Sequence, residues 1–312
     1  MGSANKVEIL QYLVDTRDLW PAATQTKDLE HEASRALALL PDDERAGVLR
    51  YYFVADAKMA LASHLLKHWA VSRCAGVPWR ETRLSRDANR KPVYVQDGRQ
   101  PAAFNVSHQA GIVALVAAPN PQQSPVELGV DVVCTTERRA RDHRIVRQDG
   151  WARFVDMHAE VFGRREAESL REQGGDDGDD AALDYKLRCF YTLWCLREAY
   201  IKMTGEALLA AWLPDLEFRG FRPPAPADGF MQEQDDGEHT IKTHDIWFKG
   251  GKVDDANVCL RALGTDYMTC TAVRTPRRKE DALAWDLGPF EFLDMEEILS
   301  FAEASSSSSA VV

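Results

Sequence analysis

The sequence lacks the segments that direct a chain into or across a membrane. No basic stretch followed by an apolar one opens it, and no run of about 18 apolar residues occurs later. We therefore expect neither secretion nor membrane insertion. The six cysteines are spread over 312 residues without a CxxC pair, so no zinc site is predicted. Free thiols of this kind are typical of a reducing compartment, and we expect a cytoplasmic protein.

An excess of positive charge is also missing. The formal net charge is -11 at pH 7, whereas nucleic-acid-binding surfaces need clustered Lys and Arg. No nucleic-acid partner is expected, although a local basic pocket could still bind a phosphate-rich small molecule. Hydrophobic residues make up 45% and charged residues 28% of the chain, which is typical of a soluble globular protein.

No period of 20–50 residues repeats, but a helix followed by strands occurs twice. An apolar residue at every fourth position predicts a first helix over 49–71, with its stripe at Phe53, Ala57, Leu61, Leu65 and Trp69. Short strand-like runs follow between 93 and 133. The second set comprises predicted helices over 151–170 and Tyr185–Thr204, the latter ended by Gly205, and strands over 255–263 and 267–275. This echo permits two similar halves that meet near 118–125.

Three polar segments interrupt or end this pattern. The acidic run 172–180 has no apolar residue to bury, so we expect a mobile insertion there. A Pro-rich polar stretch covers 222–240, and the Ser-rich segment 303–312 is expected to be a disordered tail.

Asp131 is a candidate metal ligand in the strand VELGVDVV. Alternation places it on the same face as Gly129, where a ligand or another backbone can approach closely. A lone strand Asp is more often a turn-capping or solvent-facing residue. Asp131 alone is therefore weak evidence for a site.

Trp194, Glu198 and Lys202 follow one another at intervals of four and share one face of the predicted helix. For Glu198 and Lys202 the simpler interpretation is a surface ion pair. Ser107 and His108 lie at the end of a strand-like run, where ligand sites are common. His64 and His68 form a second pair at a spacing of four, but no third ligand is evident, so packing or surface roles are expected for both.

Taken together, three segments resemble the signature motifs of the Sfp-type 4′-phosphopantetheinyl transferases. They are Asn105–Val–Ser107–His108, Leu128–Gly129–Val130–Asp131, and Trp194–Cys–Leu–Arg197–Glu198–Ala–Tyr–Ile–Lys202. The family motifs read (F/W)NxSH, (V/I)G(V/I)D and (F/W)xxKE(S/A)xxK. A segment like the family's GKP stretch precedes them, at Asn89–Arg90–Lys91–Pro92. The resemblance spans roughly residues 45–275, and the length and insertions are similar to broad-range eukaryotic, fungal-like members.

The sequence departs from the family pattern at two positions. Arg197 replaces the usual Lys, which keeps the charge but changes the donor geometry. If it packs beside the site, activity should survive. Val133 stands where bacterial members carry a further acidic metal ligand. A water could take that coordination position, since Mg²⁺ usually keeps several waters.

The resemblance implies an α+β fold of two similar α/β subdomains, related by pseudo-two-fold symmetry, with the active site between them. The expected boundaries are 1–120 for the N-terminal subdomain, 121–276 for the C-terminal one and 277–312 for an extension disordered at its end. It also implies transfer of the phosphopantetheine arm of coenzyme A to a serine of an apo carrier protein, with 3′,5′-ADP as the other product.

The resemblance further assigns roles to residues. Asp131 and Glu198 are expected to hold Mg²⁺, with Lys202 and His108 on the diphosphate. Glu198 is the candidate base, directly or through a metal-bound water. The expected coenzyme A contacts are Lys58, Arg90, Lys91, Pro92, Asn105, Ser107, His108 and Lys202.

The expected partners are apo-carrier domains of fatty acid synthase, polyketide synthase, nonribosomal peptide synthetase or aminoadipate reductase, acted on by a monomer. The basic run 137–144 could dock an acidic carrier, although a solvated basic loop is the simpler interpretation. Two alternatives are an inactive coenzyme A or carrier-binding module of the same fold and a metal-dependent phosphohydrolase. The first is disfavoured by the intact Asp131, Glu198 and Lys202, and the second by the lack of a clustered ligand set for two metals.

Overall fold

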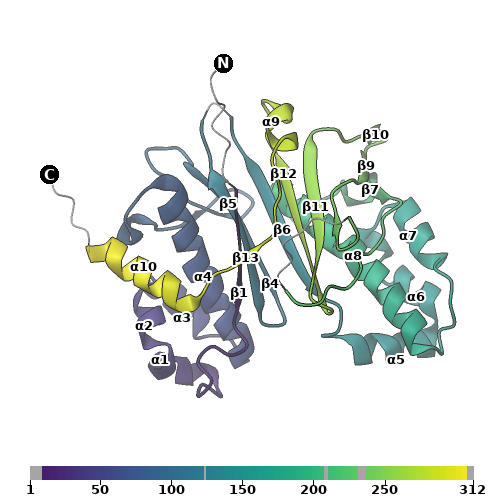
Figure 1. Ribbon diagram of the computed structural model, residues 1–312, viewed down its shortest axis with the longest axis horizontal. Helices are drawn as coiled ribbons and strands as arrows, with labels where there is room; N and C mark the ends of the chain where they lie inside the picture. Colours follow the sequence, from purple (N-terminus) through teal and green to yellow (C-terminus); the bar gives the residue numbers. More distant parts are fainter. Residues whose placement is uncertain (1–8, 123, 207–209, 231–236, 308–312) are drawn as a thin grey trace.

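In the computed structural model, two halves lie side by side, each with a long helix packed on a four-stranded sheet (Figure 1). The structure describes residues 9–122, 124–206, 210–230 and 237–307. Helices and strands are mixed throughout, which confirms the predicted α+β class. Among the described residues, no helix is both long and apolar enough to span a membrane.

The N-terminal half is built on helix α4 (Val54–Ala75). Its sheet has the order β13 (Glu291–Phe292), β1 (Leu10–Asp15), β5 (Ile112–Pro119), β4 (Ala102–Gln109). The predicted helix start at residue 49 is wrong, and so is the place of Phe53 in the apolar stripe, because that side chain is 63% exposed just before the helix. The rest of the stripe is buried, at Ala57, Leu61, Leu65 and Trp69.

The C-terminal half is built on helix α8 (Asp180–Thr204). Its antiparallel sheet has the order β6 (Glu127–Cys134), β12 (Tyr267–Arg274), β11 (Ala256–Leu263), β8 (Thr240–Ile241). Gly205 ends α8 with a φ of 77°, a left-handed conformation that favours glycine, as the sequence predicts. The hairpin of β11 and β12 also follows the prediction.

A single helix over 151–170 is wrong. The segment forms α6 (Trp151–Asp156), a short turn η3 (Ala159–Val161) and α7 (Arg164–Arg171), interrupted by Gly163. Before them, α5 (Arg139–Asp149) runs directly out of the loop that follows β6. These short helices cover one side of α8 with aromatic side chains, including Trp151, Phe154 and Phe162.

The remaining elements are short and lie around these two layers. The helical ones are η1 (Thr26–Asp28), α1 (Leu29–Glu32), α2 (Ser34–Ala38), α3 (Asp42–Val48), η2 (Trp79–Glu81), η4 (Leu213–Asp215) and α9 (Lys279–Leu283). The strands are β2 (Ser85–Arg86), β3 (Pro92–Val93), β7 (Leu216–Arg219), β9 (Asp245–Phe248) and β10 (Gly251–Lys252).

The segment after residue 276 returns to the N-terminal half. Strand β13 pairs in parallel with β1, and α10 (Met295–Ser307) packs beside α4 at the far left of Figure 1. Arg35 forms ion pairs with Glu296 and Glu303 of α10, and the Ser305 hydroxyl accepts a hydrogen bond from Trp79 N. The expected disorder from residue 303 is therefore wrong as far as Ser307, because apolar residues of α10 find a core to cover. Residues 308–312 of the expected tail lie outside the described residues.

The acidic segment 172–180 is anchored at several points. Asp177 accepts hydrogen bonds from Trp151 N and from the ammonium of Lys186, and Asp179 caps the N-terminus of α8 through Ala182 N. Carboxylates at a helix N-terminus interact favourably with the helix dipole. The segment therefore has a structural role at the start of α8 that its composition alone did not predict.

Strands β4 and β6 lie side by side where the two halves meet, and polar side chains of β4 connect them. Asn105 Oδ1 accepts a hydrogen bond from Val130 N at 3.0 Å, and Gln109 Oε1 accepts one from Cys134 N at 3.2 Å. Residues two apart on a strand point to the same side, so Ser107 must face β6 as well. This places Ser107 beside Asp131.

Candidate active site

Gly129 allows the backbone of α8 to lie directly on β6. A Cβ atom at residue 129 would lie 2.0 Å from Ala199 O and 2.4 Å from Met203 N. These distances are too short for any side chain, so only glycine fits at this position. Of the two alternatives that the sequence leaves open, it is thus another backbone that approaches this glycine. Asp131, two residues further on the same face, is thereby brought under the neighbouring turns of α8.

Asp131, Ser107 and Lys202 form one compact cluster. Lys202 Nζ lies 2.6 Å from Asp131 Oδ1 and 2.9 Å from Ser107 Oγ. The Ser107 hydroxyl in turn donates to Asp131 Oδ1 at 2.8 Å. The backbone of β6 is also held by the neighbouring strand β12, where Thr269 Oγ1 donates to the Asp131 carbonyl at 2.8 Å. The cluster therefore joins strands of both halves to the last turn of α8.

Glu198 lies one turn before Lys202 and completes the anionic side of the cluster. Its Oε2 is 4.0 Å from Lys202 Nζ, and its side chain is 14% exposed. Burial raises the pKa of Glu198, and the ammonium of Lys202 offsets part of that rise. Burial opposes the charge of Lys202, but Asp131 and Glu198 together raise its pKa. A cation is thus strongly favoured between these carboxylates.

One oxygen of Glu198 is unsatisfied. Oε1 is buried and has no hydrogen-bond partner among the described residues. Such an orphaned carboxylate oxygen is costly unless a ligand completes it. Together with Asp131 it offers hard oxygen ligands of the kind that Mg²⁺ prefers, so the residues present fit this ion. The described residues hold no group of three or more His, Cys, Asp or Glu that could ligate a metal, so these two carboxylates would be the protein's share.

His108 stands next to this cluster at the end of β4. Desolvation in the cleft and the ammonium of Lys202 both lower the pKa of His108. The neutral imidazole is therefore favoured at neutral pH, and its N–H can donate a hydrogen bond to an anionic ligand.

These residues line the floor of a cleft of about 740 Å³ between the two halves. Asp56 and Met59 of α4 form one wall, and Arg138, Arg141, Met157 and His158 belong to the opposite side. The sequence gives no signal for Asp56 and Met59, because only the packing of α4 against the β4–β5 turn brings them to the cleft. Met59 Sδ accepts a hydrogen bond from Gly111 N in that turn.

Several predicted coenzyme contacts do not line this cleft. The Asn105 side chain accepts from the backbone of β6, and Lys58 is buried in α4. Lys91 Nζ donates to Leu128 O and to Lys202 O, so it ties β6 to the end of α8. Pro92 lines a second cavity of about 330 Å³ in the N-terminal half, together with His64, Lys67 and Arg86, while Arg90 lines neither cavity.

Both departures from the family motifs have a structural explanation. Arg197 is buried and turned away from the cleft, where it pairs with Glu166 at 2.6 Å and donates to Leu213 O and Leu216 O. It therefore packs beside the site. Val133 lines the cleft on the same strand face as Asp131, but its side chain has no oxygen, so this position gives the carboxylate pair no further ligand.

The histidine pair His64 and His68 shares one carboxylate partner. Glu44 Oε2 lies 2.8 Å from His64 Nδ1 and 2.9 Å from His68 Nε2. The His68 Nδ1 atom is 2.7 Å from Thr82 Oγ1. These contacts pack α3 against α4, in agreement with the structural role expected from the sequence.

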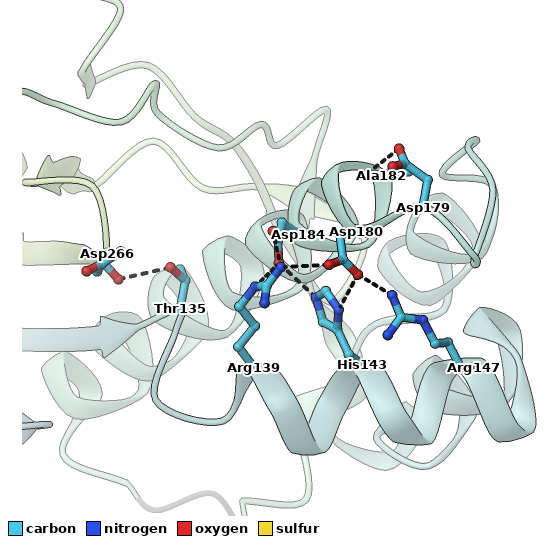
Figure 2. A network of polar contacts seen from close by, with 9 residues as sticks. All are labelled: Thr135, Arg139, His143, Arg147, Asp179, Asp180, Ala182, Asp184 and Asp266. Atoms are coloured by element: carbon cyan, nitrogen blue, oxygen red, sulfur yellow. Dashed lines mark hydrogen bonds and ion pairs between the residues drawn. The ribbon is translucent and has the colours of Figure 1, made fainter.

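The basic run 137–144 divides into two faces of α5. Figure 2 shows the inner face, where Arg139 and His143 bind Asp184 and Arg147 binds Asp180, both at the start of α8. Arg138, the residue before α5, and Arg141 within it are exposed and line the cleft. Only part of the run is therefore available to a partner, because the inner side chains fix α5 to α8.

Comparisons with known proteins agree on one family. Residues 26–120 match the family described as "4'-phosphopantetheinyl transferase, N-terminal", and residues 127–247 match the "4'-phosphopantetheinyl transferase superfamily". The chain is 47% identical over 302 residues to 4'-phosphopantetheinyl transferase 1 of Fusarium mangiferae, covering 96% of each chain.

More distant relatives point the same way. The identity to 4'-phosphopantetheinyl transferase A of Aspergillus fumigatus is 37% over 317 residues, covering 88% of this chain and 86% of the relative. It is 27% over 176 residues to the human L-aminoadipate-semialdehyde dehydrogenase-phosphopantetheinyl transferase, covering 55% of this chain and 50% of the relative. The fungal relatives thus match over most of their length.

Proposed function

Since the chain belongs to the 4′-phosphopantetheinyl transferases, we propose that it transfers 4′-phosphopantetheine from coenzyme A to a serine of an apo carrier protein in a Mg²⁺-dependent reaction. The observation that carries the proposal is the cluster of Asp131, Glu198 and Lys202 on the floor of the cleft. Two carboxylates and an ammonium there suit a diphosphate and the cation that accompanies it. An inactive binding module would have no need of this arrangement.

The proposed reaction forms a bond between the carrier serine Oγ and the β-phosphorus of coenzyme A. The bond from this phosphorus to the bridging oxygen breaks, and 3′,5′-ADP leaves with that oxygen. The serine proton passes to the carboxylate of Glu198, either directly or through a water. Lys202 and the neutral His108 donate to the diphosphate oxygens and hold them in place.

Asp131 and Glu198 are the residues that would hold Mg²⁺ in this proposal. When bound, the ion supplies charge neutralisation for the diphosphate oxygens in the transition state. The Ser107 hydroxyl donates to an Asp131 oxygen and so fixes the orientation of that carboxylate.

The nucleotide end of coenzyme A is proposed to lie toward the second cavity. Lys67 and Arg86 line it, beside Pro92 of the GKP-like segment. Burial lowers the pKa of Lys67 to about 8, and a phosphate bound beside it would favour its charged form. Lys91 is assigned to holding the end of α8 rather than to a direct contact, because its ammonium already has two carbonyl partners.

The acceptor is proposed to be an acidic carrier domain that docks beside α5. Arg138 and Arg141 are exposed at the cleft, and Met157 adds an apolar side chain that is 49% exposed. Carrier domains of fatty acid synthase, polyketide synthase, nonribosomal peptide synthetase and aminoadipate reductase are the candidates. The proposal also treats the two halves as related by a pseudo-two-fold axis, supported by the long helix on a four-stranded sheet in each.

The test is incubation of the full chain with coenzyme A, Mg²⁺ and each of several apo-carrier domains, followed by intact-mass measurement of the carrier. We expect a gain of one phosphopantetheine on at least one carrier and no gain when Mg²⁺ is chelated. A carrier whose acceptor serine is replaced by alanine serves as the control. No gain on any carrier would contradict the proposal.

A further inference from the structure

The ammonium of Lys202 occupies the position where a cation would bind the two carboxylates. Its Nζ lies 2.6 Å from Asp131 Oδ1, 2.9 Å from Ser107 Oγ and 4.0 Å from Glu198 Oε2. An added divalent ion would compete with it for Asp131 and would meet a like charge a few ångströms away. The resident ammonium therefore opposes metal binding at these carboxylates.

The ammonium satisfies only part of the pair. Asp131 Oδ1 has two donors, Ser107 and Lys202, whereas Glu198 Oε1 is buried without a partner among the described residues. The two carboxylates together carry one more negative charge than the ammonium neutralises. Lys202 therefore occupies the carboxylate pair, but one negative charge of the pair is left without a cation.

The side chain of Lys202 can move while its backbone stays fixed. Its carbonyl accepts a hydrogen bond from Lys91 Nζ at 3.0 Å, and the same ammonium of Lys91 bonds to Leu128 O of β6 at 3.2 Å. The side chain of Lys202 is 27% exposed at the cleft, and its four-carbon stem is flexible. A diphosphate in the cleft can therefore draw the ammonium away from Asp131 without moving α8.

We propose that Lys202 is a resident cation that blocks the Asp131–Glu198 pair, so that a divalent metal binds tightly only after coenzyme A has drawn its ammonium onto the diphosphate. This inference rests on the proposed function, because the diphosphate is the group that attracts Lys202. Metal binding and coenzyme A binding are then coupled. By linkage each strengthens the other by the same factor.

The coupling predicts that one substitution at Lys202 changes the affinities for metal and for coenzyme A in opposite directions. Lys202→Met removes the competing charge but keeps most of the stem, so the bare protein should bind a divalent ion more tightly. The same substitution removes a diphosphate contact, so coenzyme A should bind more weakly. A residue that only supported the fold would weaken both. Lys202→Arg keeps the positive charge and should keep metal binding weak.

The test is titration of the full chain with Mn²⁺. The concentration of free Mn²⁺ is measured by its electron paramagnetic resonance signal. The titration is done with and without saturating coenzyme A, and binding of Mn²⁺ to coenzyme A alone is subtracted. We expect the dissociation constant of wild type to fall at least about tenfold when coenzyme A is present. For Lys202→Met without coenzyme A we expect a fall of similar size, and for Lys202→Arg none. Lys252→Met, which removes an exposed ammonium that is not among the cleft-lining residues, is the charge-matched control.

Either of two results would overturn the inference. One is wild-type Mn²⁺ affinity that does not change with coenzyme A, a result that does not depend on the folding of any variant. The other is a folded Lys202→Met protein that binds Mn²⁺ no more tightly than wild type. If wild type still transfers phosphopantetheine in either case, only the inference fails. If wild type modifies no carrier, the proposed function itself fails.

Discussion

Two residues of helix α8, Arg197 and Lys202, each form an ion pair with a residue of another element, and the two pairs differ in how completely they are satisfied. Arg197 and Glu166 have side chains that are 3% and 0% exposed, and Glu166 also accepts hydrogen bonds from Gly163 N and Phe218 N. Lys202 and Asp131 are 27% and 7% exposed, and the nearby Glu198 keeps an unpaired oxygen. The first pair leaves no room for a ligand, whereas the second is incomplete without one.

The difference shows how one helix serves both the scaffold and the chemistry. Arg197 points to the loop before β7 and fixes it through Leu213 O and Leu216 O. Glu198, the next residue, points toward the cleft, about 100° around the helix. Adjacent charged residues can therefore have opposite roles, and here the unsatisfied oxygen of Glu198 distinguishes it from Arg197.

The largest expected effect comes from removing a carboxylate of the incomplete pair. Asp131→Ala or Glu198→Ala should lower the transfer rate at least about 100-fold, because charge neutralisation or proton acceptance is lost. The free energy of unfolding should change little for Glu198→Ala, which removes an incompletely paired carboxylate, and should fall more for Asp131→Ala, which leaves Lys202 and Ser107 without this partner. Carrier mass gain over time and urea unfolding are the two measurements.

A surface carboxylate provides the control for this prediction. Glu168 of α7 forms an exposed ion pair with Arg164, so Glu168→Gln should leave both measurements unchanged. Near-normal transfer by Asp131→Ala or Glu198→Ala would exclude that residue from the chemistry.

The second prediction breaks the complete pair. Arg197→Met leaves Glu166 buried without its partner and should lower the free energy of unfolding by about 3–5 kcal/mol. Arg197→Lys should cost less, because the charge is kept while the forked hydrogen bonds to the loop carbonyls are lost. Urea denaturation measures both.

The double variant Arg197→Met, Glu166→Leu separates the two causes of that loss. It should be more stable than Arg197→Met alone, since no unpaired charge remains. If Arg197→Met is as stable as wild type, the pair has no role in the scaffold and the contrast with Lys202 disappears.

The periodicities of the sequence predicted the faces on which the members of the incomplete pair lie. Strand alternation placed Asp131 with Gly129, and a spacing of four placed Glu198 and Lys202 on one helix face. Both are local rules, and only the resemblance to the family joined Asp131 to Lys202, which the structure brings into contact. Local patterns also predicted other parts of the fold, including the end of α8 at Gly205.

What the sequence did not predict depends on contacts between distant segments. Asn105 and Lys91 bind backbone atoms of neighbouring elements rather than facing the cleft, and nothing in their own segments signals this. The partner of Arg197 lies 31 residues away in a helix that was predicted with the wrong bounds. The return of β13 and α10 to the N-terminal half is likewise a tertiary contact.

The third prediction changes the distance between α8 and β6, on which the incomplete pair depends. Gly129→Ala places a methyl group against Ala199 O and should cost about 1–3 kcal/mol of stability. Transfer should also fall, because α8 must move away from Asp131. Urea denaturation and the carrier mass assay report the two effects.

Gly47→Ala is the matched control for stability, because among the described residues no atom beyond its own helix backbone and chain neighbours lies within 4 Å of the added methyl in helix α3. It should be neutral or stabilise the protein by up to about 1 kcal/mol. Equal stability of Gly129→Ala and Gly47→Ala would contradict the close packing of strand and helix.

The smallest expected effect concerns the arginines of α5 that are not held by α8. Arg138→Ala with Arg141→Ala should raise the KM for an acidic carrier several-fold and leave kcat nearly unchanged, because exposed charge pairs contribute about 0.2–1 kcal/mol each. The effect should shrink as salt rises. Arg144→Ala, on the same helix but away from the cleft lining, is the control and should leave KM unchanged. If the double variant and Arg144→Ala have the same KM at low salt, the carrier docks elsewhere. The inner and outer faces of α5 then differ only in their contacts with α8.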